Sequence, residues 1–301
     1  MDNLFEKPSL AIVVPAYREQ FLQDTLKSIA KQTNQNFKCY IFDDCSNENI
    51  KDISMRYAHF EYYRFNENLG SKNLIAHWNR CLERINEEWV WLFSDDDIME
   101  ENCVEEFYKK QKEYYNNTYL FRFRHNTINE SGVEIVPAKS IKNEYSFEFL
   151  KSTLSGNPCR LQEHIFNWEK LKKIGGFVEF PLAWCSDIAT WCLLGKEKEI
   201  IAINSAMVHF RMSGNNISSQ DSNMKEKLLA NRLFYLWCIK NFNLTLSMKW
   251  KFIMAFARYY KLPFKDYFQY PFLKSPIFVV SLVIHYLRQL KNNFLSLPRI
   301  Q

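Results

Sequence analysis

The chain has 301 residues and a formal net charge of +5, and 47% of its residues are hydrophobic and 16% aromatic. This composition can build one large domain, or one domain with an appendage, and it excludes an intrinsically disordered chain. The charge is unevenly divided along the chain. Residues 221–301 carry 13 Lys or Arg and 3 Asp or Glu, a net charge of +10, and residues 1–220 carry 26 Lys or Arg and 31 Asp or Glu, a net charge of −5. The basic end predicts an acidic partner surface, either a membrane or a nucleic acid.

The first seven residues lack the basic and then apolar pattern of a signal peptide. Eight cysteines are present, with no Cys-x-x-Cys pair. In a chain of this size without an export signal, reduced thiols are expected rather than disulfides. We therefore expect a cytoplasmic protein with free cysteines.

Apolar runs and helical patterns alternate over the first 97 residues. The runs predict strands, and the patterns between them predict helices. The expected strands are Leu10–Val14, Phe37–Phe42, Phe60–Phe65 and Trp89–Phe93, and the expected helices are Glu19–Lys31, Ile50–Tyr57 and Ser71–Ile85. This alternation predicts an α/β fold with a mostly parallel central sheet and helices on both faces.

The pattern is less regular after residue 118. Tyr119–His125 and Val133–Val136 are expected strands around a turn at 129–132, and Ser186–Leu194 is an expected helix closed by Gly195. Beyond residue 221, helices are expected at 224–240, 246–260 and 276–291. The sequence thus predicts an α/β domain over residues 1–220 and a basic, aromatic-rich helical extension over residues 221–301.

Three consecutive carboxylates, Asp95, Asp96 and Asp97, follow the apolar strand Trp89–Phe93. Adjacent carboxylates repel one another and would be costly inside a strand. At the carboxyl end of a strand, where α/β sheets bind ligands, they can hold a divalent cation. The alternative is an acidic turn, or the cap of a helix that starts near Glu100.

Glycine is absent from the first 69 residues. Neither G-x-G-x-x-G nor a P-loop can therefore occupy the first strand–helix turns. A dinucleotide-binding Rossmann enzyme and a P-loop kinase are both disfavoured.

An ordered set of motifs over residues 8–220 resembles the family 2 glycosyltransferases, which have the GT-A fold. These motifs are Val13–Glu19, Asp43–Ser46, Asn66–Gly70 with His77–Arg80, Ser94–Asp97, Ile174–Phe177, Trp184–Asp187 and Arg211–Ser218. Each motif alone is weak evidence, but their order and spacing are similar to those of the family. The resemblance is to enzymes of bacterial surface-polysaccharide synthesis.

The resemblance implies an inverting, metal-dependent glycosyltransferase of the hexosyl- or N-acetylhexosaminyltransferase class. The donor would be a nucleotide sugar, with UDP favoured, and the acceptor a saccharide or a lipid-linked saccharide. The runner-up interpretation is a catalytically silent sugar-binding or scaffold protein of the same fold. A sugar-phosphate nucleotidyltransferase ranks low, since it would need a glycine-rich loop after the first strand.

The resemblance also assigns the donor site. The residues that would bind the nucleotide are Pro15, Ala16, Tyr17, Glu19, Asp44, Asp95 and Arg211. A carboxylate at Asp44 would accept the N3–H of uracil, and Arg211 would pair with diphosphate oxygens. The alternatives are a helix cap or solvated turn for Asp44 and a surface cation for Arg211.

The metal, Mn²⁺ or Mg²⁺, would be held by Asp96, with Asp97 and His209 as further candidates. It would neutralise the charge that develops on the leaving nucleoside diphosphate. Relatives supply a histidine just after the arginine of the late loop. This chain has Ser213 there, and His209 precedes Arg211, so a structural histidine is the stronger alternative.

Asp187 is the candidate general base, because an inverting transfer needs one carboxylate to take the proton of the acceptor hydroxyl. The family shows Glu-Asp at this place, whereas this chain has Ser186-Asp187. The missing Glu bears on acceptor positioning more than on catalysis. The alternative is that Ser186 caps a helix whose dipole Asp187 complements.

The apolar run Pro276–Leu287 is shorter than the about 20 residues that cross a bilayer. With its flanking Lys and Arg residues, it predicts either a helix lying in a membrane interface or a helix docked on the first domain. Peripheral association with the inner face of the plasma membrane is therefore one hypothesis. No nucleic-acid motif is present, so a nucleic-acid partner is not expected.

Overall fold

The computed structural model describes residues 9–157, 159–214, 223–245 and 247–248. The chain forms one compact unit up to Asn243, and a second unit begins at Leu244. Apart from residues 247–248, the expected helix at 246–260 lies outside the described residues, as do the expected helix at 276–291 and the last part of the motif at 211–218. The boundary at residue 220 stays a prediction, since residues 215–222 also lie outside them.

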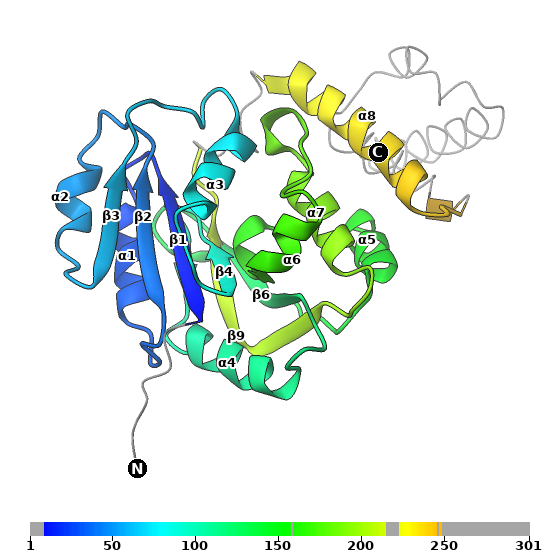
Figure 1. Cartoon of the computed structure of the whole chain (residues 1–301), viewed down its shortest axis with the longest axis horizontal. Coiled ribbons are helices and arrows are strands. Elements are labelled where there is room, and N and C mark those ends of the chain that lie inside the picture. Colours follow the sequence, from blue (N-terminus) through cyan, green and yellow to red (C-terminus); the bar gives the residue numbers. More distant parts are fainter. Residues whose placement is uncertain (1–8, 158, 215–222, 246, 249–301) are drawn as a thin grey trace, which may run out of the picture. The chain divides into compact units, whose positions relative to one another are not determined.

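One mixed sheet forms the centre of the first unit (Figure 1). Its strands are β1 (Leu10–Ala16), β2 (Lys38–Asp43), β3 (Phe60–Arg64), β4 (Trp89–Leu92), β5 (Ile98–Met99), β6 (Leu120–Ile128), β7 (Glu134–Val136), β8 (His164–Asn167) and β9 (Ile201–Arg211). Their order across the sheet is β3-β2-β1-β4-β8-β6-β9-β5, and β7 pairs with β6.

The strand directions decide which residues share an edge of the sheet. Strands β3, β2, β1 and β4 are parallel, β8 is antiparallel to both of its neighbours, and β6 and β9 are parallel to each other. The carboxyl ends of β1, β2, β4, β6 and β9 therefore lie at one edge, together with the amino end of β8. Ligands of α/β folds bind at such an edge.

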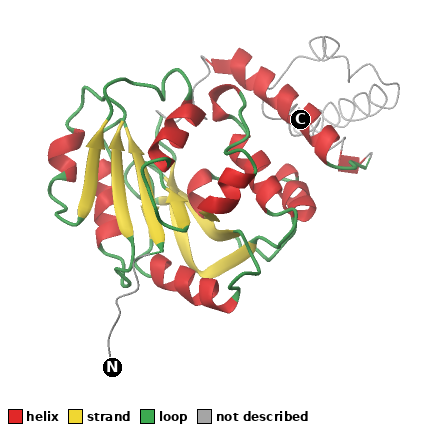
Figure 2. Cartoon of the chain, in the orientation of Figure 1, coloured by secondary structure: helices red, strands yellow, loops and turns green. Residues whose placement is uncertain are grey.

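Helices cover both faces of the sheet (Figure 2). They are α1 (Leu22–Ala30), α2 (Ile50–Ser54), α3 (Leu74–Leu82), α4 (Cys103–Glu113), α5 (Ser146–Leu154), α6 (Trp168–Lys173), α7 (Ser186–Leu194) and α8 (Met224–Asn241), with short 3₁₀ turns η1 (Leu161–Glu163) and η2 (Pro181–Ala183). The apolar faces of α1, α2 and α4 pack with the sheet in one core cluster. Helix α3 packs against β1, and α8 packs against η2 and α7.

Local chemistry explains where several helices begin. The Asn73 side chain accepts a hydrogen bond from the Ala76 N–H, and the Asn167 side chain accepts one from the Lys170 N–H. Both bonds satisfy a donor that the first turn of a helix leaves free. They set the starts of α3 and α6.

The structure confirms the predicted α/β class with helices on both faces. Each strand and helix expected before residue 94 is present, and no end differs by more than three residues. Helices α5 and α6 and strand β8 were not predicted. All eight cysteines are free, as expected. Among the described residues, no helix is both long and apolar enough to cross a bilayer.

Candidate active site

Three loops at the carboxyl edge of the sheet are tied to one another. They follow β1 (17–19), β2 (44–48) and β4 (94–97). The Asp95 Oδ2 accepts hydrogen bonds from the backbone N–H groups of Tyr17 (2.9 Å) and Arg18 (3.1 Å). The Ser46 hydroxyl donates to the Tyr17 carbonyl (2.6 Å). The structure thus brings together the motifs Val13–Glu19, Asp43–Ser46 and Ser94–Asp97, as their positions after parallel strands predict.

The residues predicted to meet the nucleotide at the first loop differ in their exposure. Pro15 and Ala16 end β1, and Ala16 is fully buried. The Tyr17 side chain is 42% exposed, so its ring is free to stack on a planar base. The Glu19 Oε2 accepts the Asn49 N–H (3.2 Å), which joins the first loop to the start of α2.

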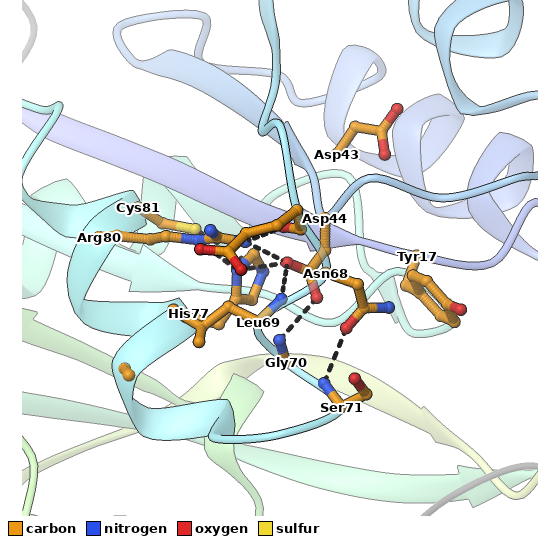
Figure 3. A network of polar contacts seen from close by, with 12 residues as sticks. Tyr17, Asp43, Asp44, Asn68, Leu69, Gly70, Ser71, His77, Arg80 and Cys81 are labelled. Atoms are coloured by element: carbon orange, nitrogen blue, oxygen red, sulfur yellow. Dashed lines mark hydrogen bonds and ion pairs between the residues drawn. The ribbon is translucent and has the colours of Figure 1, made fainter.

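Asp44 lies inside a network of polar contacts rather than at the surface (Figure 3). It is 3% exposed, and its Oδ1 and Oδ2 accept the N–H groups of Leu69 (3.0 Å) and Gly70 (2.8 Å). His77 Nδ1 lies 3.1 Å from its Oδ1, and Arg80 also pairs with that oxygen. Burial by itself raises the pKa of Asp44, but these hydrogen bonds outweigh burial and hold the pKa below its usual value.

The role predicted for Asp44, accepting the N3–H of uracil, would require its carboxylate to exchange a present partner for the base. In this arrangement Asp44 instead fixes the loop that precedes α3. The sequence pattern could not show this, because the partners of Asp44 lie 25 or more residues away along the chain.

Asp95 and Asp96 are half-buried neighbours whose charges disfavour each other. Burial raises the pKa of Asp95, although the N–H groups of Tyr17 and Arg18 oppose this rise. Burial, and then the charge of Asp95, raises the pKa of Asp96 to about 7. The Ser213 hydroxyl lies 3.4 Å from the Asp96 Oδ2. A cation at this place would relieve the repulsion and favour both ionised forms.

Asp97 and Arg211 are joined inside the protein. Asp97 is 1% exposed, its Oδ1 accepts the Arg211 backbone N–H (2.8 Å), and its Oδ2 is buried with no hydrogen-bond partner among the described residues. The Arg211 guanidinium donates to the backbone carbonyls of Asp96 (2.9 Å) and Glu130 (2.7 Å) and pairs with Asp24 (3.2 Å). The diphosphate contact predicted for Arg211 would need these bonds to be replaced, so its role here is to fasten the end of β9.

His209 lies on β9 opposite Ile98, and its side chain bonds to Asn126 rather than to the aspartates that it was predicted to join. Its Nδ1 is 2.7 Å from the Asn126 side-chain oxygen, and the carboxylates that act on it are Glu100 and Glu134. Burial lowers the pKa of His209, which favours its neutral form. This surrounding fits the structural alternative for His209 better than a shared metal site with Asp96.

Among the described residues, no three His, Cys, Asp or Glu side chains gather in a way that could hold a metal by themselves. Mg²⁺ commonly binds through one or two carboxylates and completes its shell with water and substrate phosphate oxygens. The oxygen atoms of Asp96, next to Asp95, fit that mode. His209 fits it less well, because its Nδ1 faces the Asn126 oxygen. Asp97 is 1% exposed and its Oδ1 is bonded to the Arg211 N–H, which leaves only the buried Oδ2 as a candidate ligand.

Asp187 stands in the first turn of α7, at the same edge of the sheet. Its Oδ1 accepts the Ile188 N–H (2.8 Å), and Cys185 before the helix has a left-handed φ of 64°. Burial raises the pKa of Asp187 to about 6, and the charge of Arg160 opposes the rise. Ser186 is fully buried, and its hydroxyl accepts the Phe180 N–H (3.1 Å), so it anchors the helix start. A carboxylate with a pKa near neutrality suits a general base.

Next to Asp187 lies a buried ion-pair network that the sequence did not reveal. Glu163 is fully buried, and it pairs with Arg122 Nε (2.8 Å) and His125 Nδ1 (2.9 Å). Arg122 also reaches Glu144 (3.5 Å). Burial by itself raises the pKa of Glu163, but the charges of Arg122 and His125 outweigh it and hold the pKa at about 2. No spacing signal links residues 122 and 163, which meet only because β6 pairs with β8.

Comparison with known sequences gives a family match and two curated relatives. The model of "Glycosyl transferase family 2" matches residues 11–162. The chain is 24% identical over 225 residues to TuaG of Bacillus subtilis, a glycosyltransferase named for teichuronic acid biosynthesis, covering 71% of this chain and 82% of TuaG. It is 30% identical over 109 residues to the glycosyltransferase GlyA of Streptococcus pneumoniae, covering 35% of this chain but 15% of GlyA.

Comparison with solved structures gives the same fold. The S. aureus TarS fragment 1–349 in complex with UDP-GlcNAc matches with a TM-score of 0.64 at 16% identity, over 86% of this chain and 75% of that one. The complex of this fragment with UDP matches with a TM-score of 0.59 at 15% identity, over 89% and 75% of the two chains. At this identity the likeness establishes the fold alone, and it confirms the predicted GT-A fold.

Proposed function

Because this chain belongs to glycosyl transferase family 2, we propose that it transfers a sugar from a UDP-sugar, with inversion, to a hydroxyl group of a cell-surface saccharide. The names of two similar proteins support this choice: TuaG is named for teichuronic acid biosynthesis, and the TarS fragment was solved with UDP-GlcNAc. An N-acetylhexosamine is accordingly the first donor sugar to test, ahead of a simple hexose.

One observation carries the proposal: an exposed aromatic ring, a pair of carboxylates and a carboxyl with a raised pKa share one edge of the sheet. Tyr17 offers a stacking surface for a base, and Asp95 and Asp96 stand behind it after β4. Asp187 enters the same edge from α7. The donor and the acceptor can thus be held side by side, which supplies much of the rate enhancement of a two-substrate reaction.

In the proposed reaction, the acceptor hydroxyl oxygen attacks the anomeric carbon while Asp187 accepts its proton. The bond from the anomeric carbon to the diphosphate oxygen breaks on the opposite side, and UDP leaves with the electron pair. A divalent cation at Asp96 would supply positive charge for the diphosphate. Asp95 keeps the loop after β1 in place, and Arg211 fastens the strand that carries Ser213.

We extend the proposal to the place where the enzyme acts, the cytoplasmic face of the plasma membrane, with a lipid-linked saccharide as acceptor. Helix α8 supports this, because it presents an exposed apolar stripe: Leu229 is 48% exposed, Leu233 38%, Leu236 47% and Ile239 43%. Arg232 and Lys240 are exposed on the same helix, and residues 221–301 carry a net charge of +10. Apolar side chains beside basic ones favour binding to anionic lipids.

A thermal-shift experiment tests the donor site. UDP-GlcNAc, UDP-glucose and GDP-mannose are each added with Mn²⁺, with Mg²⁺ or with EDTA. A ligand that binds only the folded protein raises its apparent stability, by about 2.7 kcal/mol at 100 times Kd. We expect a shift with one UDP-sugar that needs the metal and disappears in Asp96→Ala, but persists in the control Asp52→Ala on the exposed face of α2.

Absence of any nucleotide shift would overturn the proposal and favour the silent scaffold. Binding without turnover would favour the scaffold as well, so the donor that binds is then incubated with the enzyme and release of UDP is measured. Release in the wild type and loss of release in Asp187→Asn, with donor binding unchanged, is the expected result for an enzyme.

A further inference from the structure

Arg160 is a half-buried arginine whose charge is not neutralised by any contact in the described structure. Its backbone is fixed on both sides, because its N–H donates to the Glu163 Oε1 (2.6 Å) and its carbonyl lies 3.0 Å from His164 Nδ1. Its guanidinium carbon lies 4.4 Å from the centre of the Phe210 ring. Its Nε is shut off from solvent and has no hydrogen-bond partner among the described residues.

Two arginines that are buried more deeply than Arg160 have partners for their guanidinium groups, whereas the Nε of half-buried Arg124, like that of Arg160, has none among the described residues. Arg122 pairs with Glu163 and Glu144, and Arg211 pairs with Asp24 and donates to two carbonyls. A partly desolvated cation without such partners costs free energy. That cost is offset when a bound molecule supplies the missing acceptor.

The position of Arg160 places it on the acceptor side of the site. It precedes η1 at the amino end of β8, and the Trp91 indole N–H donates to the Gln162 carbonyl (2.7 Å), which ties η1 to the end of β4. Arg160 is the charged group that acts most strongly on Asp187. The cations that act on Asp95 and Asp96 are instead Arg18 and Arg211.

We infer that Arg160 binds an anionic group, a carboxylate or a phosphate, carried by the acceptor saccharide close to the hydroxyl that Asp187 deprotonates. A planar guanidinium can donate two parallel hydrogen bonds to either group. It would also offset the repulsion between an anionic acceptor and the carboxylates of Asp187 and Glu163. This inference rests on the proposed glycosyl transfer and names the substrate class for it.

Matched pairs of small probes test the inference with the full chain and UDP present. The pairs are methyl β-D-glucuronide with methyl β-D-glucoside, and glycerol 3-phosphate with glycerol, each titrated by ligand-observed NMR. We expect the charged member of one pair to bind at least tenfold more tightly than its neutral partner. Preference within the first pair identifies a carboxylate acceptor, and preference within the second a phosphate acceptor.

Arg160→Gln should remove the preference while leaving the melting temperature and UDP-sugar binding unchanged, and Arg160→Lys should restore part of it. Arg56→Gln, at an exposed arginine that bonds to Gln23, is the control and should keep the full preference. Equal binding within both pairs, no binding of any probe, or a preference that survives in Arg160→Gln would overturn the inference. Failure of UDP-sugar binding in the wild type would instead refute the proposed function, so the two failures are distinguishable.

Discussion

Asp95, which lies 78 residues after Tyr17 in the chain, holds Tyr17 in place by accepting a hydrogen bond of 2.9 Å from the Tyr17 backbone N–H with its Oδ2. The same oxygen accepts the Arg18 N–H. The carboxylate at the end of β4 therefore shapes the loop after β1, where the nucleotide base is expected to stack. Asp95 bonds to the backbone N–H groups of residues 17 and 18. Any residue except proline would supply these groups, so the sequence of this loop does not reveal the contact.

Asp95→Ala should weaken UDP-sugar binding at least tenfold, because the loop loses both bonds that orient it. Stability should fall by only about 1–2 kcal/mol, since water can reach the freed N–H groups of the exposed loop. Titration calorimetry and urea unfolding measure the two effects. Unchanged donor affinity in a folded Asp95→Ala variant would show that this loop does not contact the donor.

Gly70 faces the carboxylate of Asp44 at a distance that leaves no room for a side chain. A Cβ at position 70 would lie 2.6 Å from the Asp44 Oδ2, so Gly70→Ala must displace that carboxylate from its network. We expect a loss of about 1–3 kcal/mol, in the range of an overpacked buried site. Gly214→Ala is the matched control, because a Cβ there meets no described residue within 4 Å. Equal stability of the two variants in urea unfolding would contradict this account.

The first half of the fold could be read from the sequence because its signals are local. Apolar runs of four to seven residues mark β1, β2 and β4, and apolar residues at helical spacing mark the helices between them. Strand β5 has only two residues, which is too short for any periodic pattern. Strand β8 runs antiparallel between β4 and β6, and its partners along the sheet lie far away in the sequence.

The candidate site likewise has features that local sequence signals predict and features that they do not. The positions of Tyr17, Asp95 and Asp187 at one edge follow from motifs at strand ends and a helix start. The partners of Asp44 and Arg211, and the pairing of Glu163 with Arg122, follow from contacts between distant segments, which no spacing rule contains. The ligand-binding roles predicted for Asp44 and Arg211 therefore lack support, because both side chains are bonded to other groups of the protein.

Glu163→Gln should destabilise the protein strongly, because it leaves the buried guanidinium of Arg122 without its main partner. Removing one member of a buried ion pair costs about 3–5 kcal/mol. The folded pKa of Glu163 is about 2, below its usual value of 4.5. Its contribution to stability is thus complete above about pH 4.5 and is lost as the pH falls toward 2.

Urea unfolding of the wild type and Glu163→Gln between pH 3 and pH 8 checks this. The difference should be largest above pH 5 and should shrink as the pH falls. Glu169→Gln, at an exposed glutamate that pairs with Lys172 on the same helix, should cost less than about 1 kcal/mol at every pH. A large difference that does not depend on pH would show that Glu163 acts through packing rather than charge.

The exposed stripe on α8 should contribute to membrane binding. The double variant Leu233→Ser with Leu236→Ser removes two exposed apolar side chains, and each is expected to leave the fold intact since neither is in the core. We expect at least a tenfold loss of binding to vesicles of phosphatidylglycerol, measured by sedimentation. Met55→Ser, at an exposed apolar residue that directly follows α2, is the control. Equal binding to neutral phosphatidylcholine vesicles, or no loss in the double variant, would refute this role of the helix.

The pH dependence of the reaction should report Asp187. Its pKa is raised from 3.8 to about 6, chiefly by burial, and the base must be ionised to accept a proton. The value of kcat/KM for the acceptor should therefore be constant above about pH 7 and fall about tenfold for each unit below pH 6. Asp187→Asn should abolish turnover across the whole range while UDP-sugar binding persists.

The raised pKa of Asp187 also predicts an effect on stability, opposite in sign to the effect of Glu163, whose pKa is lowered. Folding opposes the ionisation of a carboxyl group whose pKa is higher in the folded protein than in the unfolded one. The wild type therefore loses stability as the pH rises from about 4 to 6. Asp187→Asn should consequently be more stable than the wild type at pH 8, by about 2–3 kcal/mol, with the difference vanishing near pH 4. If the variant were less stable at pH 8, Asp187 would be a structural cap of α7, and the base would have to be sought elsewhere.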